Sequence, residues 1–142
     1  MSRVQLALRV ADLEGSIAFY SRLFGVEPAK RRPGYANFAV EQPPLKLVLI
    51  EGTDAQAPTL LDHLGVEVED TQQVTAATAR LAGEGLATDV EENTTCCYAV
   101  QDKVWVTGPG DERWEVYTVL GDARADLEGK SAGEDTVAGC CG

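Results

Sequence analysis

The sequence predicts an α+β protein built from two tandem βαβββ modules, and three observations support this class. Residues 63–83 repeat the pattern of residues 5–25, in which an alternating strand is followed by an aspartate, an amphipathic helix and a glycine. Three further strand candidates follow each helix. The strands alternate apolar and polar residues, which is typical of sheets covered by helices on one face. The modules are expected at 3–52 and 61–120, within one domain spanning 1–120.

The first module is expected to begin with a strand whose Leu6, Leu8 and Val10 share one face. Asp12 is placed to cap a helix, and Gly25 is placed to end it. The helix would bury Leu13, Ile17, Tyr20 and Phe24. The three strands that follow are EPAKRR, YANFAV and LKLVLIEG.

The second module repeats this order from a strand containing Leu64, Val66 and Val68. Asp70 and Gln73 form a predicted capping box, and Gly83 is the expected end of the helix. The apolar residues of this helix are Val74, Ala77 and Leu81. Its later strands are ATDVEE, KVWVTG and RWEVYTVL, with a turn at Pro109–Gly110 joining the last two.

Composition narrows the function classes. The formal charge is −11, from 23 acidic residues against 12 Lys and Arg, so nucleic acid and anionic membranes are excluded as expected partners. With no signal peptide or membrane-length apolar run, a cytoplasmic location is expected, where cysteines stay reduced. Residues 121–142 are rich in Gly, Ala and charge, and predict a flexible tail ending in Cys140–Cys141.

Three polar residues are candidates for one site. Gln5 lies opposite the helix-facing side of its strand, His63 is its equivalent in the second module, and Glu115 alternates with Trp114. All three can point into one concavity beside small residues. Each has a simpler alternative. His63 could be a structural histidine, Gln5 an ordinary polar residue on a sheet face, and Glu115 a solvated carboxylate on an edge strand.

Cys96 and Cys97 are adjacent, which does not suit a structural disulfide. Neighbouring α-carbons lie ~3.8 Å apart, whereas an unstrained disulfide prefers roughly 4.4–6.8 Å. Two adjacent thiolates can instead hold one soft atom. The second module has an insertion around NTTCCYAVQD (93–102), which we expect to be a substrate loop. The simpler alternative is that the cysteines are buried small residues.

The pattern resembles the vicinal oxygen chelate superfamily, which includes glyoxalases, bleomycin-resistance proteins and extradiol dioxygenases. The resemblance covers residues 3–120 and includes the closing hairpin VTGPGDERWEV. It implies an open, cup-shaped mixed sheet with helices outside, and a metal held by Gln5, His63 and Glu115. QLALRVADLEGSIAFYSRLFG, KRRPGYANFAV, TTCCYAVQDKVWVTGPG and ERWEVYT further resemble the organoarsenical carbon–arsenic lyases and the mycobacterial-type cadmium-induced protein.

That narrower resemblance implies Fe(II)- and dioxygen-dependent cleavage of trivalent methyl or aryl arsenicals, with release of arsenite. Mn(II), Co(II) and Ni(II) are the expected substitutes for iron. Cys96 and Cys97 match the arsenic-holding residues, and a homodimer is expected.

Weaker candidates are Lys103 as a catalytic cation, for which a solvated lysine is the alternative, and Tyr98 and Val100 as substrate contacts. Two rival functions remain open at this point. One is another metal-dependent dioxygenase or glyoxalase-like reaction, and the other is non-catalytic binding of Cd(II) or As(III) by thiols.

Overall fold

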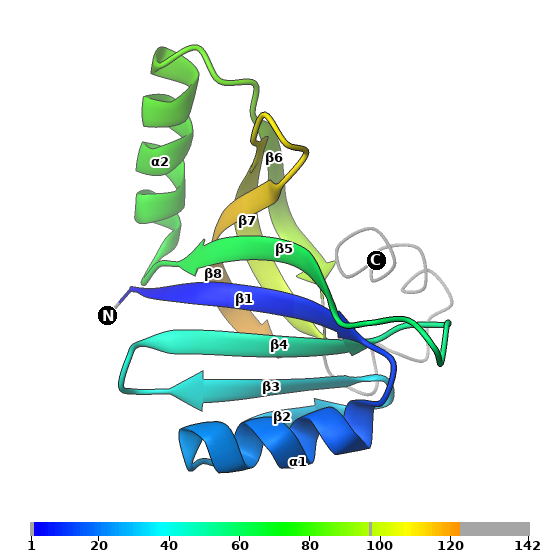
Figure 1. The fold of residues 1–142 in the computed structure, drawn as a ribbon. Coiled ribbons are helices and arrows are strands. Elements are labelled where there is room, and N and C mark those ends of the chain that lie inside the picture. The colour runs from blue at the N-terminus through cyan, green and yellow to red at the C-terminus, as the bar shows by residue number, and fades with distance from the viewer. Residues whose placement is uncertain (1, 97, 123–142) are drawn as a thin grey trace. The chain divides into compact units, whose positions relative to one another are not determined.

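The computed structural model describes residues 2–96 and 98–122. They group into two compact units, one spanning Arg3–Gly65 and the other beginning at Val66. The elements, drawn in Figure 1, are β1 (Arg3–Val10), α1 (Leu13–Phe24), β2 (Lys30–Arg32), β3 (Tyr35–Val40), β4 (Leu45–Glu51), β5 (Leu60–Glu67), α2 (Thr71–Gly83), β6 (Asp89–Cys96), β7 (Ala99–Thr107) and β8 (Arg113–Asp122).

The first unit contains a mixed sheet in the order β2-β3-β4-β1-β5. β1 pairs in parallel with β4, while β3 is antiparallel to both β2 and β4. Helix α1 contacts β3 and β4, and the core between them is made of aliphatic and aromatic side chains. The buried members of this core are Val10, Leu13, Ile17, Ala36, Phe38, Val40, Leu45, Leu47 and Leu49.

Both ends of α1 lie where the sequence predicts them. The Asp12 carboxylate accepts a hydrogen bond from the Gly15 amide at 3.0 Å, which satisfies one of the unpaired donors of the first turn. Gly25 adopts the left-handed conformation (φ 68°) that ends many helices. Local sequence chemistry is therefore sufficient to define this helix.

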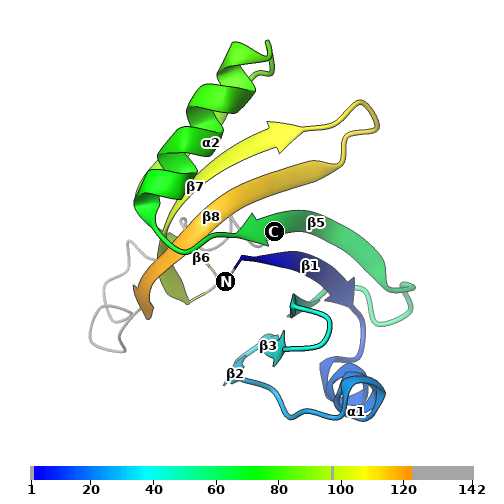
Figure 2. The ribbon, with the colours of Figure 1, turned by 90° about the vertical axis from the view of Figure 1, so that its left-hand side faces the viewer.

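The second unit holds α2 and an antiparallel arrangement in the order β8-β7-β6. Figure 2 shows α2 against β7 and β8, which it contacts. Its core contains Val74 and Leu81 from the helix and Val104 from β7. Partly buried Val68, Val106 and Val116 complete it. The helix thus covers the face of β7 and β8 that carries valines. The opposite face carries Lys103 and Glu115.

The predicted α+β class and the two βαβββ modules are confirmed. Helix α2 ends at Gly83, as expected, but Gly83 is not the residue that reverses the chain. The reversal comes at Gly85 (φ 84°), and the Leu86 amide donates to the carbonyl of Leu81. Asp70 caps the start as predicted, accepting from the Gln73 amide at 2.9 Å.

The expectation that 93–102 form a long loop is wrong for the described residues of that range. Residues 93–96 and 99–102 belong to the paired ends of β6 and β7, where Cys96 pairs with Ala99. The second module has longer strands here, because β6 and β7 have 8 and 9 residues where β2 and β3 have 3 and 6. A bulge between Glu91 and Thr94, with Asn93 at φ 52°, adds one residue to β6. The bulge is held by Asp102, whose carboxylate accepts from the Asn93 amide and from the Thr71 hydroxyl, each at 2.7 Å.

The chain end also differs in part. β8 continues through Gly121 and Asp122, which were expected to belong to the tail. The rest of the predicted tail, including Cys140 and Cys141, lies outside the described residues. Among residues 2–96 and 98–122, neither helix has the length and apolarity that crossing a bilayer requires.

Candidate functional site

Gln5 and His63 are the two predicted ligands in the first unit. They lie on β1 and β5, which are neighbouring strands, and they are 4% and 3% exposed. Gln5 shares its face of β1 with Ala7, while Leu6, Leu8 and Val10 belong to the core beside α1. The predicted assignment of faces on this strand is therefore correct.

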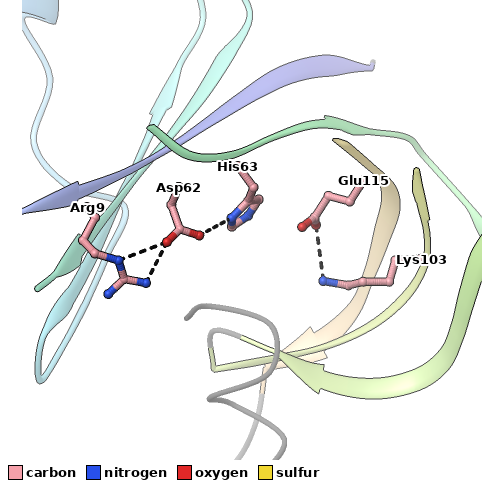
Figure 3. Close-up of polar contacts among 5 residues, drawn as sticks. All are labelled: Arg9, Asp62, His63, Lys103 and Glu115. Atoms are coloured by element: carbon pink, nitrogen blue, oxygen red, sulfur yellow. Dashed lines mark hydrogen bonds and ion pairs between the residues drawn. The ribbon is translucent and has the colours of Figure 1, made fainter. Parts of the chain in front are cut away.

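His63 is oriented by a chain of polar contacts that the sequence analysis missed. Its Nδ1 lies 2.7 Å from one carboxylate oxygen of Asp62. The other oxygen of Asp62 accepts from Arg9, at 2.7 Å from Nη2 and 3.1 Å from Nε. Figure 3 shows Asp62 between its two partners.

The electrostatics of Asp62 determine which nitrogen of His63 carries the proton. Burial raises the pKa of the Asp62 carboxyl, but the hydrogen bonds from His63 and Arg9 outweigh it and hold the pKa below its ordinary value of 3.8. An ionised carboxylate only accepts hydrogen bonds, so Nδ1 of His63 is the donor. A metal would therefore be bound through Nε2, in the arrangement that metal-binding histidines commonly show.

Glu115, the third predicted ligand, lies in the second unit and contacts Lys103. Lys103 Nζ is 3.3 Å from Glu115 Oε1, and the two side chains are 2% and 3% exposed (Figure 3). The ammonium group also lies 5.2 Å from the ring centre of Trp105 and 5.7 Å from that of Tyr117. These four residues form the face of β7 and β8 that α2 does not cover.

The interpretation of Lys103 as a solvated lysine is wrong, because it is one of the largest fully buried side chains. Burial lowers its pKa, and the neighbouring Glu115 carboxylate opposes this effect only in part. Strand alternation contains the relevant signal, since Lys103 shares a face with Trp105 and lies opposite Tyr117 in the adjacent strand. Lysine is rarely buried without a partner, which is why a solvated side chain was the alternative for Lys103.

Cys96 is the last residue of β6 and is fully buried. The Gln101 amide group donates to the carbonyl oxygen of Cys96 at 3.1 Å. Cys96 is disulfide-bonded in this structure, so binding a metal or metalloid through its sulfur would require reduction. Its predicted companion Cys97 lies outside the described residues.

The two weaker substrate candidates lie just after Cys97 in the sequence. Tyr98 is a turn residue with φ 66°, and Val100 lies on β7; both are half-buried. The predicted site residues are thus divided between the units, with Gln5 and His63 in the first and Cys96, Lys103 and Glu115 in the second.

The predicted ligand set combines an amide oxygen, an imidazole and a carboxylate, a donor set that suits Fe(II), Mn(II) or Co(II). Within the described residues, no three His, Cys, Asp or Glu side chains are grouped as a metal site. The predicted set contains only two residues of those types, with Gln5 as the third ligand. The Asp62 contact to His63 is the observation that fits a metal here, because it leaves Nε2 as the coordinating atom.

This chain is similar to several known proteins. Residues 3–116 match the Glyoxalase/Bleomycin resistance protein/Dioxygenase superfamily. A protein of Thermomonospora curvata named trivalent organoarsenical cleaving enzyme is 64% identical over 152 aligned positions, covering 99% of this chain and 100% of that one. The cadmium-induced protein CadI of Mycobacterium tuberculosis is 65% identical over 123 residues, covering 87% of this chain and 80% of that protein.

Among solved structures, the Mn(II)-bound glyoxalase from Novosphingobium aromaticivorans is similar with a TM-score of 0.61 and 20% identity. The match covers 89% of this chain and 43% of the glyoxalase. A likeness at that identity concerns the fold. The match over residues 3–116 shows that the chain belongs to the glyoxalase/bleomycin resistance protein/dioxygenase superfamily.

Proposed function

We propose that this protein cleaves the carbon–arsenic bond of trivalent methyl or aryl arsenicals, using Fe(II) and dioxygen, and releases arsenite. The observation that carries the proposal is the 64% identity, over nearly the whole of both chains, to a protein named for cleavage of trivalent organoarsenicals. The adjacent pair Cys96–Cys97 gives this chain two sulfurs for a thiophilic atom.

In this proposal Gln5, His63 and Glu115 hold the metal. Three protein ligands leave coordination positions open, and Fe(II) bound in this way would supply redox chemistry with dioxygen. The Asp62 carboxylate keeps the proton of His63 on Nδ1, which the proposed coordination through Nε2 requires. Mn(II), Co(II) or Ni(II) would occupy the same ligands as substitutes for iron.

Cys96 and Cys97 hold the arsenic in this proposal. A trivalent arsenical carrying two hydroxyl groups exchanges both for the two cysteine thiols: two As–S bonds form, two As–O bonds break, and each hydroxyl group leaves as water with a thiol proton. The arsenic keeps its organic group, for which Tyr98 and Val100 are the candidate contacts. The reaction needs reduced cysteines, which fits the expected cytoplasmic location.

Lys103 is the candidate catalytic cation. Its ammonium group, buried beside Glu115, would supply positive charge where dioxygen is reduced. Burial strengthens this effect, because charges interact more strongly where water is excluded.

The proposal is tested by loading the reduced, metal-free protein with Fe(II) under anaerobic conditions, adding trivalent methylarsenical and then admitting air. Arsenite should form only when iron and air are both present, and it should be lost in the His63→Ala variant. A matched variant at an exposed position, Asp89→Ala, should retain it. Arsenite formation without iron, or none in the complete mixture, would refute the proposal.

A second candidate function is sequestration of As(III) or Cd(II) by the cysteines without catalysis. The observation that favours it is the 65% identity to a protein named for its induction by cadmium. Sequestration predicts that the organoarsenical is recovered intact from the denatured complex. It also predicts that Cys140 and Cys141 matter as much as the central pair.

A further inference from the structure

Arg9 connects the two strands that carry Gln5 and His63. It lies on β1, four residues after Gln5 and on the same face, because alternate side chains of a strand point the same way. Its guanidinium reaches the carboxylate of Asp62 on β5, the residue just before His63. The Asp62 side chain is 8% exposed, so the ion pair is buried at its carboxylate end. The contact therefore links the two strands of the first unit that carry predicted ligands.

The contact with Arg9 determines how the Asp62 carboxylate is turned. Arg9 Nε and Nη2 both donate to Oδ2, at 3.1 and 2.7 Å, while His63 Nδ1 lies 2.7 Å from Oδ1 (Figure 3). The terminal torsion of an aspartate has a broad distribution, so an unrestrained carboxylate turns over a wide range. Two donors that converge on Oδ2 restrict this torsion, and the restricted torsion directs Oδ1 at the imidazole.

Gly52 makes room for the Arg9 side chain. It follows β4, and its amide donates to the carbonyl of Val10 at 2.8 Å, which holds its backbone against the end of β1. A Cβ atom at this position would lie 3.2 Å from Arg9 Cγ and 3.5 Å from Cδ, and the shorter distance is tighter than nearly all real Cβ contacts. The backbone of Gly52 lies outside the left-handed region, so conformational freedom does not explain the glycine. The close approach of the arginine stem does explain it.

We propose that Arg9 is a positioning residue for the metal centre, and that Gly52 supplies the space its side chain needs. Arg9 holds Oδ2 of Asp62, and Oδ1 then holds the Nδ1 proton of His63, which keeps Nε2 free of a proton. The inference rests on the proposed function, because it assumes that His63 binds the metal. A ring held in its binding orientation loses less entropy when it coordinates a metal.

Charge and positioning predict opposite effects of removing Arg9. The guanidinium repels a divalent cation, so on charge alone its loss should strengthen metal binding. Loss of positioning should weaken binding instead, because outer partners of a metal-bound histidine contribute about 10–100-fold to metal affinity. We expect Arg9→Met to weaken Mn(II) binding about tenfold, the lower end of that range, since Asp62 itself remains. The direction of the change therefore separates the two effects.

The tautomer of His63 can be read without metal or substrate, because this is the only histidine in the chain. The full-length, metal-free protein is labelled with ¹⁵N-histidine and its imidazole nitrogens are observed by NMR, about two pH units above the ordinary histidine pKa of ~6.5. Wild type should carry the proton on Nδ1, and Arg9→Met should show a mixture of both tautomers. Arg9→Lys keeps the charge without the fork of donors, so it should lie between them. Gly52→Ala should also be intermediate, because it displaces the arginine stem.

Two matched controls test whether the effect belongs to this position. Arg31→Met removes an exposed arginine that pairs with Glu14 in the same unit. Gly83→Ala adds a Cβ atom that meets no described group within 4 Å beyond its chain neighbours and its own helix. Both controls should keep the Nδ1 tautomer and the Mn(II) affinity of wild type. Mn(II) is titrated alone, and the free ion is measured by electron paramagnetic resonance.

The possible contrary results have different meanings. A pure Nδ1 tautomer in Arg9→Met, or Mn(II) binding that is unchanged or tighter in that variant, would refute the role of Arg9 and leave the metal site in place. A lower Tm with the wild-type tautomer would show that the ion pair only stabilises the fold. If wild type has the Nδ1 tautomer and does not bind Mn(II), the proposed metal site is refuted together with the inference.

Discussion

Replacing Asp62 by asparagine tests how His63 is prepared for a metal. Asp62 presents two acceptor oxygens to two donors, His63 Nδ1–H and the Arg9 guanidinium, each at a shortest distance of 2.7 Å. Asparagine keeps the shape but has only one acceptor oxygen. The permanently charged Arg9 is the stronger donor, so we expect it to take that oxygen and leave the amide NH₂ facing His63.

The consequence is a change of tautomer. A donor facing Nδ1 favours the form of His63 whose proton is on Nε2, and this proton occupies the atom through which we propose that the metal binds. Loss of an outer-shell partner of a metal-bound histidine typically lowers metal affinity about 10–100-fold. This corresponds to about 1.4–2.7 kcal/mol at ~1.36 kcal/mol per tenfold change.

The assay is an anaerobic Fe(II) titration of the metal-free protein in competition with a chromogenic chelator. Asp62→Asn should bind Fe(II) about 10–100-fold more weakly than wild type. Asp89→Asn, the same replacement at an exposed position of β6, should bind it like wild type. Wild-type affinity in a folded Asp62→Asn variant would refute the reasoning.

Three further predictions concern Cys96, Lys103 and the pH dependence of stability. Cys96→Ala should abolish arsenite formation while iron content stays near that of wild type, as measured by metal analysis of the loaded protein; retained turnover would refute the thiol role. Lys103→Met leaves the buried Glu115 without its ammonium partner. Thermal unfolding should therefore show the metal-free variant destabilised by about 3–5 kcal/mol, and Fe(II) should raise its Tm more than that of wild type. An unchanged Tm without metal would contradict this. Because the pKa of Asp62 is lowered in the folded protein, its stabilising contribution is present above pH 3.8 and is lost as pH falls through the lower folded pKa. In urea unfolding below pH ~4, the free energy of unfolding should therefore depend less steeply on pH for Asp62→Asn than for wild type. Equal slopes would contradict the assignment.

Much of the fold could be predicted because its signals are local. Asp12 and Gly25 define α1 through capping chemistry that involves only nearby residues. Strand alternation placed Gln5 and Ala7 opposite the core-facing leucines, and the structure confirms that placement. Helix α2 ends at Gly83 as expected, although the left-handed reversal is made by Gly85, two residues later.

The contacts around the candidate ligands could not be predicted in the same way. Arg9 and Asp62 are far apart in the sequence, and nothing local indicates that they pair. For Lys103 the solvated alternative was wrong, because its burial depends on Glu115 and on two aromatic rings that the pairing of β7 with β8 brings together.

The loop expected at 93–102 was wrong for a further reason. An insertion relative to the first module indicated a loop, but β6 and β7 are longer than β2 and β3, and a bulge at Asn93, held by Asp102, adds one more residue within a paired strand. A bulge of this kind depends on a side chain nine residues away and leaves little trace in the periodicity of the strand itself.

The most direct test of the central claim is a single turnover followed by arsenic speciation. Reduced protein with one Fe(II) and one trivalent methylarsenical per chain is assembled without oxygen, exposed to air, denatured and separated by chromatography with element detection. The account predicts that the bound arsenic is recovered as arsenite, and that the Cys96→Ala protein returns methylarsenical. Recovery of intact methylarsenical from the wild-type complex after exposure to air would contradict it.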